Sequence, residues 1–106
     1  MTKTETNIKC AELLHPNKTY RDAGVHGIEI KGSDFFGEES LGYINIYDPN
    51  KVDAYKVGEK LGITIQKRSA KILNDWACFR SATDVCHDPD QHTALVKCIE
   101  KVVNEN

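Results

Sequence analysis

The chain has 106 residues, a formal net charge of −2 at pH 7 and an isoelectric point near 6.1. This length fits one domain over residues 1–106 with a modest core. The nearly balanced charge gives no basis for binding nucleic acid or an anionic membrane, and no apolar run approaches the roughly 20 residues of a membrane span. We therefore expect neither nucleic acid nor membrane as a partner.

The first predicted element is a helix over residues 6–15. Ile8, Ala11 and Leu14 recur at helical spacing, and a proline directly after this segment ends the run. Residues 17–23 suit one short helical turn, because a glycine follows and would stop it. The first quarter of the chain is therefore predicted to be helical.

Residues 25–47 allow two interpretations. Ile28 and Ile30 alternate with a glutamate, and a similar alternation recurs over 43–47, which is the period of a β-hairpin. Residues 38–47 also suit a helix. We favour the helix, because an isolated two-stranded hairpin is only marginally stable in water.

The second half of the chain predicts three more helices. An Asp-Pro pair precedes the first, over 49–61, and Gly62 suits its left-handed C-terminal cap. A broad apolar stripe that includes Trp76 predicts the next helix over 66–82. A second Asp-Pro pair starts the last helix, over 89–104, which carries apolar residues at helical spacing.

These elements together predict an all-α fold, a small disulfide-linked domain of four to five helices. The alternative is an α+β fold with a small hairpin within residues 25–47. Neither interpretation contains an internal repeat or a low-complexity segment.

Four cysteines, Cys10, Cys78, Cys86 and Cys98, predict two disulfides, because an even number in a short chain lacks the spacing of a metal site. Disulfides form in oxidising compartments, so we expect a secreted, extracellular protein whose Met1 replaces a removed leader. If 66–82 and 89–104 were antiparallel helices, Cys98 would lie roughly 15 Å from the turn that holds Cys86. That distance favours Cys78–Cys86 with Cys10–Cys98, while Cys78–Cys98 with Cys10–Cys86 stays open.

No constellation of catalytic side chains emerges from the sequence. The four histidines form neither HxH nor HExxH, and the chain has no GxSxG motif and no phosphate-binding loop. His87, Asp88, Asp90 and His92 lie close together, but they suit a solvated segment at a helix start. We therefore expect a non-enzymatic protein with no cofactor and no metal.

Binding is the remaining class of function, and one stretch has the composition of a protein-binding surface. Aromatic anchors and charged residues are typical of such surfaces. In the opposing interpretation the phenylalanines of this stretch are core and its acidic residues merely solvate it. A small-ligand carrier of the odorant-binding or D7 type is an alternative, because the last three cysteines have a loosely similar rhythm. The candidate partner-binding residues are Asp34, Phe35, Phe36, Glu38, Glu39, Tyr43 and Tyr47.

Two stretches carry a family resemblance: TYRDAGVHGIEIKGSDFFGEESLGYINIYDPNKV (residues 19–52) and, after a predicted helix, NDWACFRSATDVC (residues 74–86). Together with the size of the chain and its four cysteines, they resemble the SG7 family of anopheline mosquito salivary proteins, which includes the albicin-like and anophensin-like proteins. The resemblance implies a mostly helical fold with two disulfides, secreted in saliva and injected into blood during feeding.

The same resemblance implies a function, since members of that family inhibit plasma cascades of the host. It implies a secreted inhibitor of the complement alternative pathway that binds the C3b–Bb convertase. The alternative is an inhibitor of contact activation in the kallikrein–kinin system, with factor XII and kininogen as partners. In both cases the implied partners are host plasma proteins.

Overall fold

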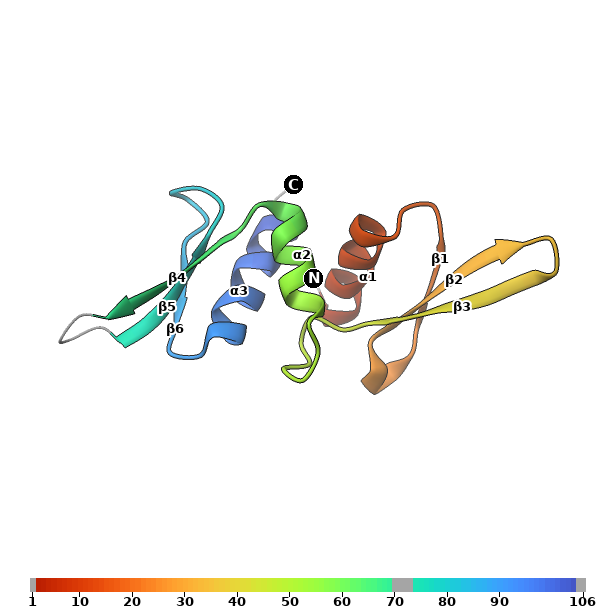
Figure 1. Cartoon of the computed structure of the whole chain (residues 1–106), viewed down its shortest axis with the longest axis horizontal. Coiled ribbons are helices and arrows are strands. Elements are labelled where there is room, and N and C mark those ends of the chain that lie inside the picture. The colour runs from red at the N-terminus through yellow and green to blue at the C-terminus, as the bar shows by residue number, and fades with distance from the viewer. Residues whose placement is uncertain (1, 70–73, 105–106) are drawn as a thin grey trace.

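Three helices lie across the middle of the molecule, and a three-stranded antiparallel sheet lies at each end (Figure 1). The computed structural model describes residues 2–69 and 74–104, and the molecule measures 59 × 27 × 22 Å. The fold is mixed α+β, so the all-α prediction is wrong and the α+β alternative is nearer. The elements are α1 (Lys3–Leu14), β1 (Thr19–Asp22), the 3-10 helix η1 (Gly24–His26), β2 (Ile28–Asp34), β3 (Gly37–Ile44), α2 (Asp53–Leu61), β4 (Thr64–Ser69), β5 (Asn74–Phe79), β6 (Cys86–Asp88) and α3 (Gln91–Asn104).

The helix predicted over 6–15 is confirmed as α1, which begins earlier, at Lys3. The Thr2 hydroxyl accepts a hydrogen bond of 3.1 Å from the Glu5 N–H, and a threonine in this position satisfies one of the free donors of a helix start. The polar cap, rather than the first apolar residue, therefore sets the start of this helix.

The helices predicted over 49–61 and 89–104 are confirmed as α2 and α3, each starting a little later than expected. Gly62 ends α2 in the left-handed conformation, with φ of 75°, as the sequence predicts. The cap of α3 is Asp90 and not Asp88, because the Asp90 carboxylate accepts an N–H of the first helical turn at 2.9 Å.

The first sheet, in the order β1-β2-β3, replaces two segments that the sequence predicted as helix. Residues 17–23 contain β1, and residues 38–47 contain most of β3. A hairpin of β2 and β3 alone would be marginal, but β1 adds a third strand and α1 covers one face. Ile28, Ile30 and Ile44 fill that covered face and are at most 2% exposed.

The second sheet, in the order β4-β5-β6, lies where a helix was predicted over 66–82. Ile65 and Cys78 are directly paired across β4 and β5, and they lie on the face that packs against α3. Trp76 follows two residues before Cys78 and therefore shares this face, since side chains alternate along a strand. An apolar stripe of this kind fits the period of a helix as well as that of a strand. Residues 70–73, which supply part of the stripe in the sequence, lie outside the described residues.

The hydrophobic core lies where the helices meet both sheets. α3 contributes Leu95 and Ile99, and α1 contributes Cys10 and Ala11, all of them fully buried. The layer of helices therefore covers one face of each sheet. Further buried members of this core are Ile46, Ala54, Val57, Cys78, Ala94, Val96, Cys98 and Val102.

A β-bulge interrupts the pairing of β2 with β3. Lys31 pairs with Ser40, but Ile30 pairs with Gly42, so Leu41 is an extra residue in β3. Gly42 takes φ of 123°, which suits a glycine at this irregularity. The bulge lies in an edge strand of the sheet, because β3 pairs only with β2 in the observed strand order.

Gly27 connects η1 to β2 at a point of close backbone contact. Its φ is +90°, and a Cβ atom there would lie 2.2 Å from the carbonyl oxygen of Ile44 and 2.6 Å from Cβ of Asn45. Gly24 offers a comparison, because it has φ of +63° but no atom within 4 Å of the same position. Gly27 is therefore required by both conformation and space, whereas Gly24 is required by conformation alone.

We predict that Gly27→Ala destabilises the protein by about 2–5 kcal/mol, since strain of about 1–2 kcal/mol adds to overpacking of about 1–3 kcal/mol. Gly24→Ala is the matched control, and it should lose stability only through the backbone strain of about 1–2 kcal/mol. Urea unfolding followed by circular dichroism measures both losses, and equal losses for the two variants would contradict this account.

Candidate functional site

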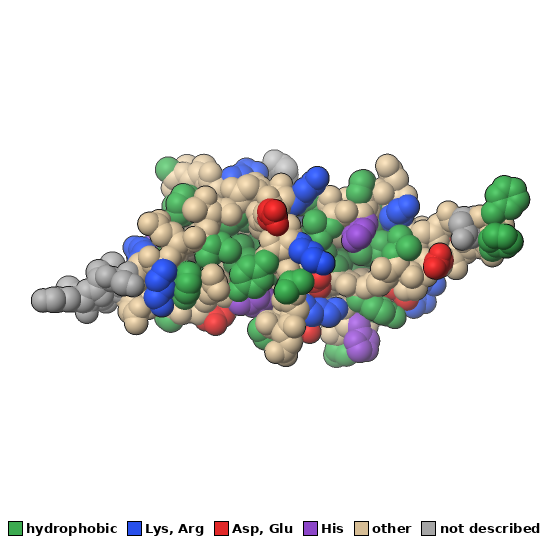
Figure 2. Space-filling view, in the orientation of Figure 1, with side chains coloured by type: hydrophobic (Ala, Val, Ile, Leu, Met, Phe, Trp, Pro, Cys, Tyr) green, Lys and Arg blue, Asp and Glu red, His purple; other side chains and the backbone are tan. Residues whose placement is uncertain are grey.

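The β2–β3 hairpin extends beyond the body of the molecule and forms one of its two ends (Figure 1). We name residues 32–41 the hairpin arm. Phe35 and Phe36 at its tip are 101% and 96% exposed, and Figure 2 shows hydrophobic side chains gathered at this end. Two adjacent phenylalanines in solvent leave a large apolar area uncovered, which marks a candidate contact surface.

The turn at the tip does not require aromatic side chains. β2 ends at Asp34 and β3 begins at Gly37, so Phe35 and Phe36 are the two residues of the loop. Such loops favour Asn, Asp and Gly, which tolerate positive φ, and here Gly37 takes the positive φ of 115°. Aromatic side chains are therefore not the residues that a turn of this kind favours.

Acidic residues follow the aromatic tip. Glu38 and Glu39 are both exposed, and the Glu38 carboxylate lies 3.9 Å from the Lys31 ammonium. The side chain of Asp34, another predicted partner-binding residue, lies outside the described residues. The arm thus presents an apolar end with negatively charged residues behind it.

A buried carboxylate anchors the base of the arm. Glu29 on β2 is 5% exposed; it accepts hydrogen bonds from Arg21 at 2.6 Å and from the Ser40 hydroxyl at 3.0 Å. Burial by itself would raise the pKa of Glu29, but the Ser40 hydrogen bond and the charges of Arg21 and Lys31 outweigh it. The pKa therefore lies below the ordinary value. These bonds join β1, β2 and β3 and hold the arm in register.

The structure separates the two tyrosines that the sequence placed in the same site. Tyr43 lies near the base of the arm, is 46% exposed and has its ring 5.8 Å from that of His26. Tyr47 lies beyond β3, where its hydroxyl donates to Glu100 at 3.0 Å and the Lys3 ammonium lies 5.0 Å from its ring centroid. Burial, mainly, raises the pKa of Tyr47 to about 12. Tyr47 is therefore part of the packing between helices and not of the arm.

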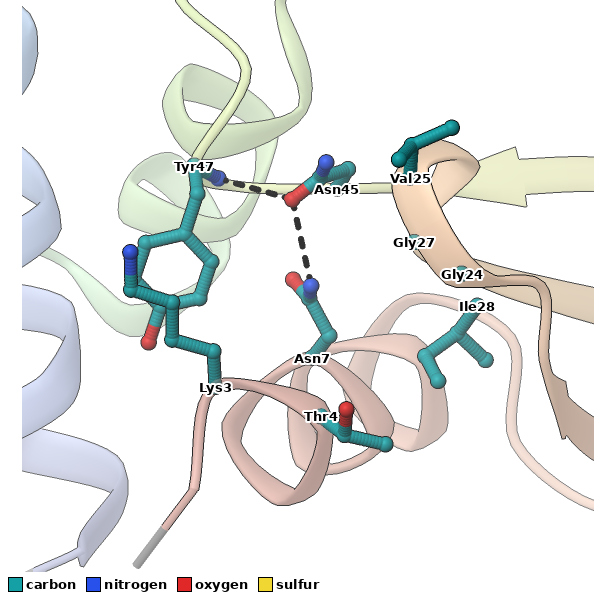
Figure 3. Close-up of a pocket in the computed structure, with 9 residues that line it drawn as sticks. All are labelled: Lys3, Thr4, Asn7, Gly24, Val25, Gly27, Ile28, Asn45 and Tyr47. Carbon is teal, nitrogen blue, oxygen red and sulfur yellow. Dashed lines mark hydrogen bonds between the residues drawn. The ribbon is translucent and has the colours of Figure 1, made fainter.

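Tyr47 borders a cavity of about 250 Å³ that the sequence analysis missed (Figure 3). The buried Asn7 amide of α1 donates to Asn45 Oδ1 at 3.1 Å, and Asn7 Oδ1 accepts from the Ile46 N–H at 3.0 Å. Because these amides are paired with one another, they tie α1 to the chain after β3 and offer few free groups to a ligand. The cavity is lined by Lys3, Thr4, Asn7, Gly24, Val25, Gly27, Ile28, Asn45 and Tyr47.

A second cavity, of about 270 Å³, is also lined by Lys3 and Tyr47 and is bordered by α3. His92 lines it, and its Nε2 atom is buried without a hydrogen-bond partner among the described residues. The His92 ring lies 6.4 Å from that of Tyr55, which places it in an aromatic environment. No spacing in the sequence signals this cavity, because it forms only when α3 packs beside residues from the first half of the chain.

The four cysteines are free thiols, so the prediction of two disulfides is wrong in both of its pairings. Cys10 lies in α1. Cys78 and Cys86 are direct partners on β5 and β6, and Cys98 on α3 lies close enough to interact with Cys86. Counting cysteines could not reveal this arrangement, because it depends on the pairing of β5, which was predicted as helix, with β6, which lies in the predicted turn. The prediction of secretion rested on the disulfides, and the free thiols give it no support.

The buried thiols have little nucleophilic character. Burial raises the pKa of Cys10 to about 12, that of Cys78 to about 11 and that of Cys98 to about 12, with neighbouring thiols adding to the shift for Cys78 and Cys98. Cys86 is partly exposed, and burial raises its pKa as well. Because only the thiolate attacks, none of these groups is activated for chemistry at neutral pH.

Residues 2–69 and 74–104 contain no group of three His, Cys, Asp or Glu residues arranged to hold a metal ion. Over the same residues, no helix is long and apolar enough to cross a membrane. No known protein family, characterised protein or solved structure shows significant similarity to this chain. The geometry of the arm and of the cavities is therefore the basis for a functional conclusion.

We predict that the protein becomes less stable as the pH falls, in part through Glu29. The pKa of Glu29 is lower in the folded state than its unfolded value of about 4.3, so its contribution is complete above that value and is lost as the pH falls through the folded pKa. Glu29→Gln should reduce the loss of stability as the pH falls through this range. Thermal unfolding between pH 7 and pH 2.5 measures it, and an unchanged slope in the variant would contradict the role of Glu29.

We predict that a thiol reagent at pH 8 modifies Cys86 first and the other three cysteines only when the protein unfolds. The reason is that Cys86 is partly exposed, whereas the other three thiols are fully buried. Ellman's reagent followed over time gives the rates, and Cys86→Ser should remove the fast phase. Fewer than four reactive thiols after unfolding without a reductant would show that a disulfide is present after all.

Proposed function

We propose that this protein is a binding protein that inserts the tip of its hairpin arm into an apolar pocket of a protein partner. The observation that carries the proposal is the exposure of Phe35 and Phe36, at 101% and 96%. Turns of this kind do not favour aromatic side chains, so a partner is the most direct reason for two exposed rings at this position.

Burial of the tip can contribute several kcal/mol to binding, which offsets part of the entropy cost of association. Burying one phenylalanine side chain contributes about 1.5–3 kcal/mol, and two at one tip contribute about twice that. The arm is also ordered before binding, since its two strands pair as far as Asp34 and Gly37 and the Glu29–Ser40 hydrogen bond anchors its base. A preorganised anchor loses less conformational entropy on association, which leaves more of the burial energy for affinity.

The charge of the arm favours a protein over a membrane. Glu38 and Glu39 lie directly behind the tip and are exposed. An anionic lipid surface would repel these carboxylates as the phenylalanines approach, whereas a protein pocket with basic residues on its rim would attract them. The partner that this geometry fits has an apolar pocket beside a positively charged surface.

The identity of the partner is a separate question. The resemblance to anopheline salivary proteins implies the C3b–Bb convertase, or factor XII and kininogen, but the mixed fold and the free thiols differ from what that resemblance implies. Secretion and inhibition of the alternative pathway therefore stay predictions, and the arm supports protein binding as a class. These plasma proteins are nevertheless the first partners to test.

The test uses immobilised C3b–Bb, factor XII and kininogen with three proteins: the wild type, Phe35→Ser with Phe36→Ser, and Val52→Ser. Val52 is 59% exposed and lies outside the arm, so its variant is the control for loss of an exposed apolar residue. For a true partner, we expect the double variant to bind at least roughly 30-fold more weakly and Val52→Ser to bind like the wild type.

Lysis of rabbit erythrocytes by human serum in magnesium–EGTA buffer gives a functional readout of the alternative pathway. Protection by the wild type, lost in the double variant, would support complement inhibition through the arm. Equal protection by all three proteins would refute the arm as the binding element. No binding to any of the plasma proteins and no protection would remove them as partners.

A further inference from the structure

A second candidate surface lies at the opposite end of the molecule from the arm, on the second sheet. It is a hollow of about 470 Å³ on the outward face of that sheet, within the range of about 300–1,000 Å³ that ligand pockets occupy. Ala77, which is 4% exposed, lies between Gln66 and His87 on the neighbouring strands. We name this surface the sheet hollow, lined in part by Arg68, Ala77, Phe79, Arg80, Val85 and His87.

The lining of the sheet hollow combines apolar and cationic groups. Phe79 and Val85 contribute apolar surface, while Arg68 and Arg80 contribute positive charge. Arg68 is already paired with Asp75 by hydrogen bonds of 2.7 and 2.8 Å. Arg80 is less committed, because its side chain is 48% exposed and its Nε lies 3.7 Å from the Asp84 carboxylate, beyond hydrogen-bond distance.

The hairpin arm has the complementary chemistry. Its tip is two phenylalanines, and Glu38 and Glu39 follow directly behind them. Aromatic rings suit an apolar hollow, and exposed carboxylates suit a guanidinium on its rim, where a charged hydrogen bond to Arg80 can form. The hairpin arm at one end of the chain's fold therefore has the composition that the sheet hollow at the other end can bind.

We propose that the sheet hollow receives the hairpin arm of a second copy of this chain, so that molecules associate head to tail. This inference rests on the proposed function, because it uses the same arm as the binding element and names one partner for it. The arm and the second sheet lie at opposite ends of the long axis (Figure 1), so the contact can join molecules end to end.

The geometry of this contact determines the kind of assembly. The two surfaces differ, so each molecule in a pair still has one free arm and one free hollow, and growth continues until a ring closes. A hairpin tip in a hollow buries less area than a standard protein interface, so we expect weak association that depends on concentration and weakens with salt.

Sedimentation velocity of the full chain from about 5 to 500 μM tests the proposal. We expect the weight-average mass of the wild type to rise over this range and to fall again in 0.5 M NaCl. Phe35→Ser with Phe36→Ser removes the arm tip and should stay monomeric. Arg80→Glu replaces the proposed partner of the arm carboxylates with a negative charge and should also stay monomeric. Ala82→Glu, at an exposed position in the lining, gives a second hollow variant that leaves the Arg80–Asp84 pair intact.

A mixture of the two kinds of variant gives the sharpest outcome. The arm variant has an intact hollow and each hollow variant has an intact arm, so an equimolar mixture should form dimers that grow no further. Circular dichroism confirms that each variant is folded. A monomeric wild type at 500 μM, or a mixture that stays monomeric while the wild type associates, would overturn the proposal.

These outcomes also separate this inference from the proposed function. Association that is lost in the arm variant but retained in both hollow variants would refute the sheet hollow and keep the arm as a binding element. A wild type that stays monomeric, yet binds a plasma protein through its arm, would also refute the sheet hollow and keep the arm as a binding element. Association that persists in all variants would refute both surfaces as its source.

Discussion

The whole structure depends on one constraint: each three-stranded sheet has a single covered apolar face, and one layer of three helices must cover both. α1 packs on the first sheet and α3 on the second, while α2 contacts both helices. Leu95 and Ile99 of α3 and Ala11 of α1 are fully buried as a result. A sheet of three strands gains stability from such a cover, so neither sheet is expected to persist without the helices. The same arrangement sets the outer ends of both sheets apart, which is where the arm and the sheet hollow lie.

Local signals in the sequence identified the helices, because the residues that start and end a helix lie within a few positions of it. Gly62 ended α2 as predicted, and Thr2 and Asp90 show the same local logic for α1 and α3. Most of the strands were assigned to helices, or kept only as the alternative hairpin within residues 25–47, because their stability comes from distant partners. The hairpin of β2 and β3 looked marginal only while β1 and the cover of α1 were left out. The apolar stripe around Trp76 matches a helix and a strand equally well, and only the pairing with β4 distinguishes them.

The candidate site divides in the same way. Composition alone pointed to Phe35, Phe36, Glu38 and Glu39, since aromatic and acidic residues stand next to one another in the chain. It also included Tyr47, which the structure places outside the arm, because an alternating pattern continues in the sequence after the strand has ended at Ile44. The sheet hollow was not predictable, since it needs β4, β5 and the return to β6 to bring its lining together. Free cysteines were missed for a related reason: their distances depend on the fold and not on their number.

The bulge at Leu41 has a consequence for how this molecule behaves in a crowded solution. β3 is an edge strand, and an unbroken edge is a template on which another chain can add a strand and begin to aggregate. The extra residue breaks the regular row of donors and acceptors along that edge and increases the local twist. The exposed edge of the hairpin is therefore interrupted at the base of the arm, which shortens the regular stretch on which another strand could pair.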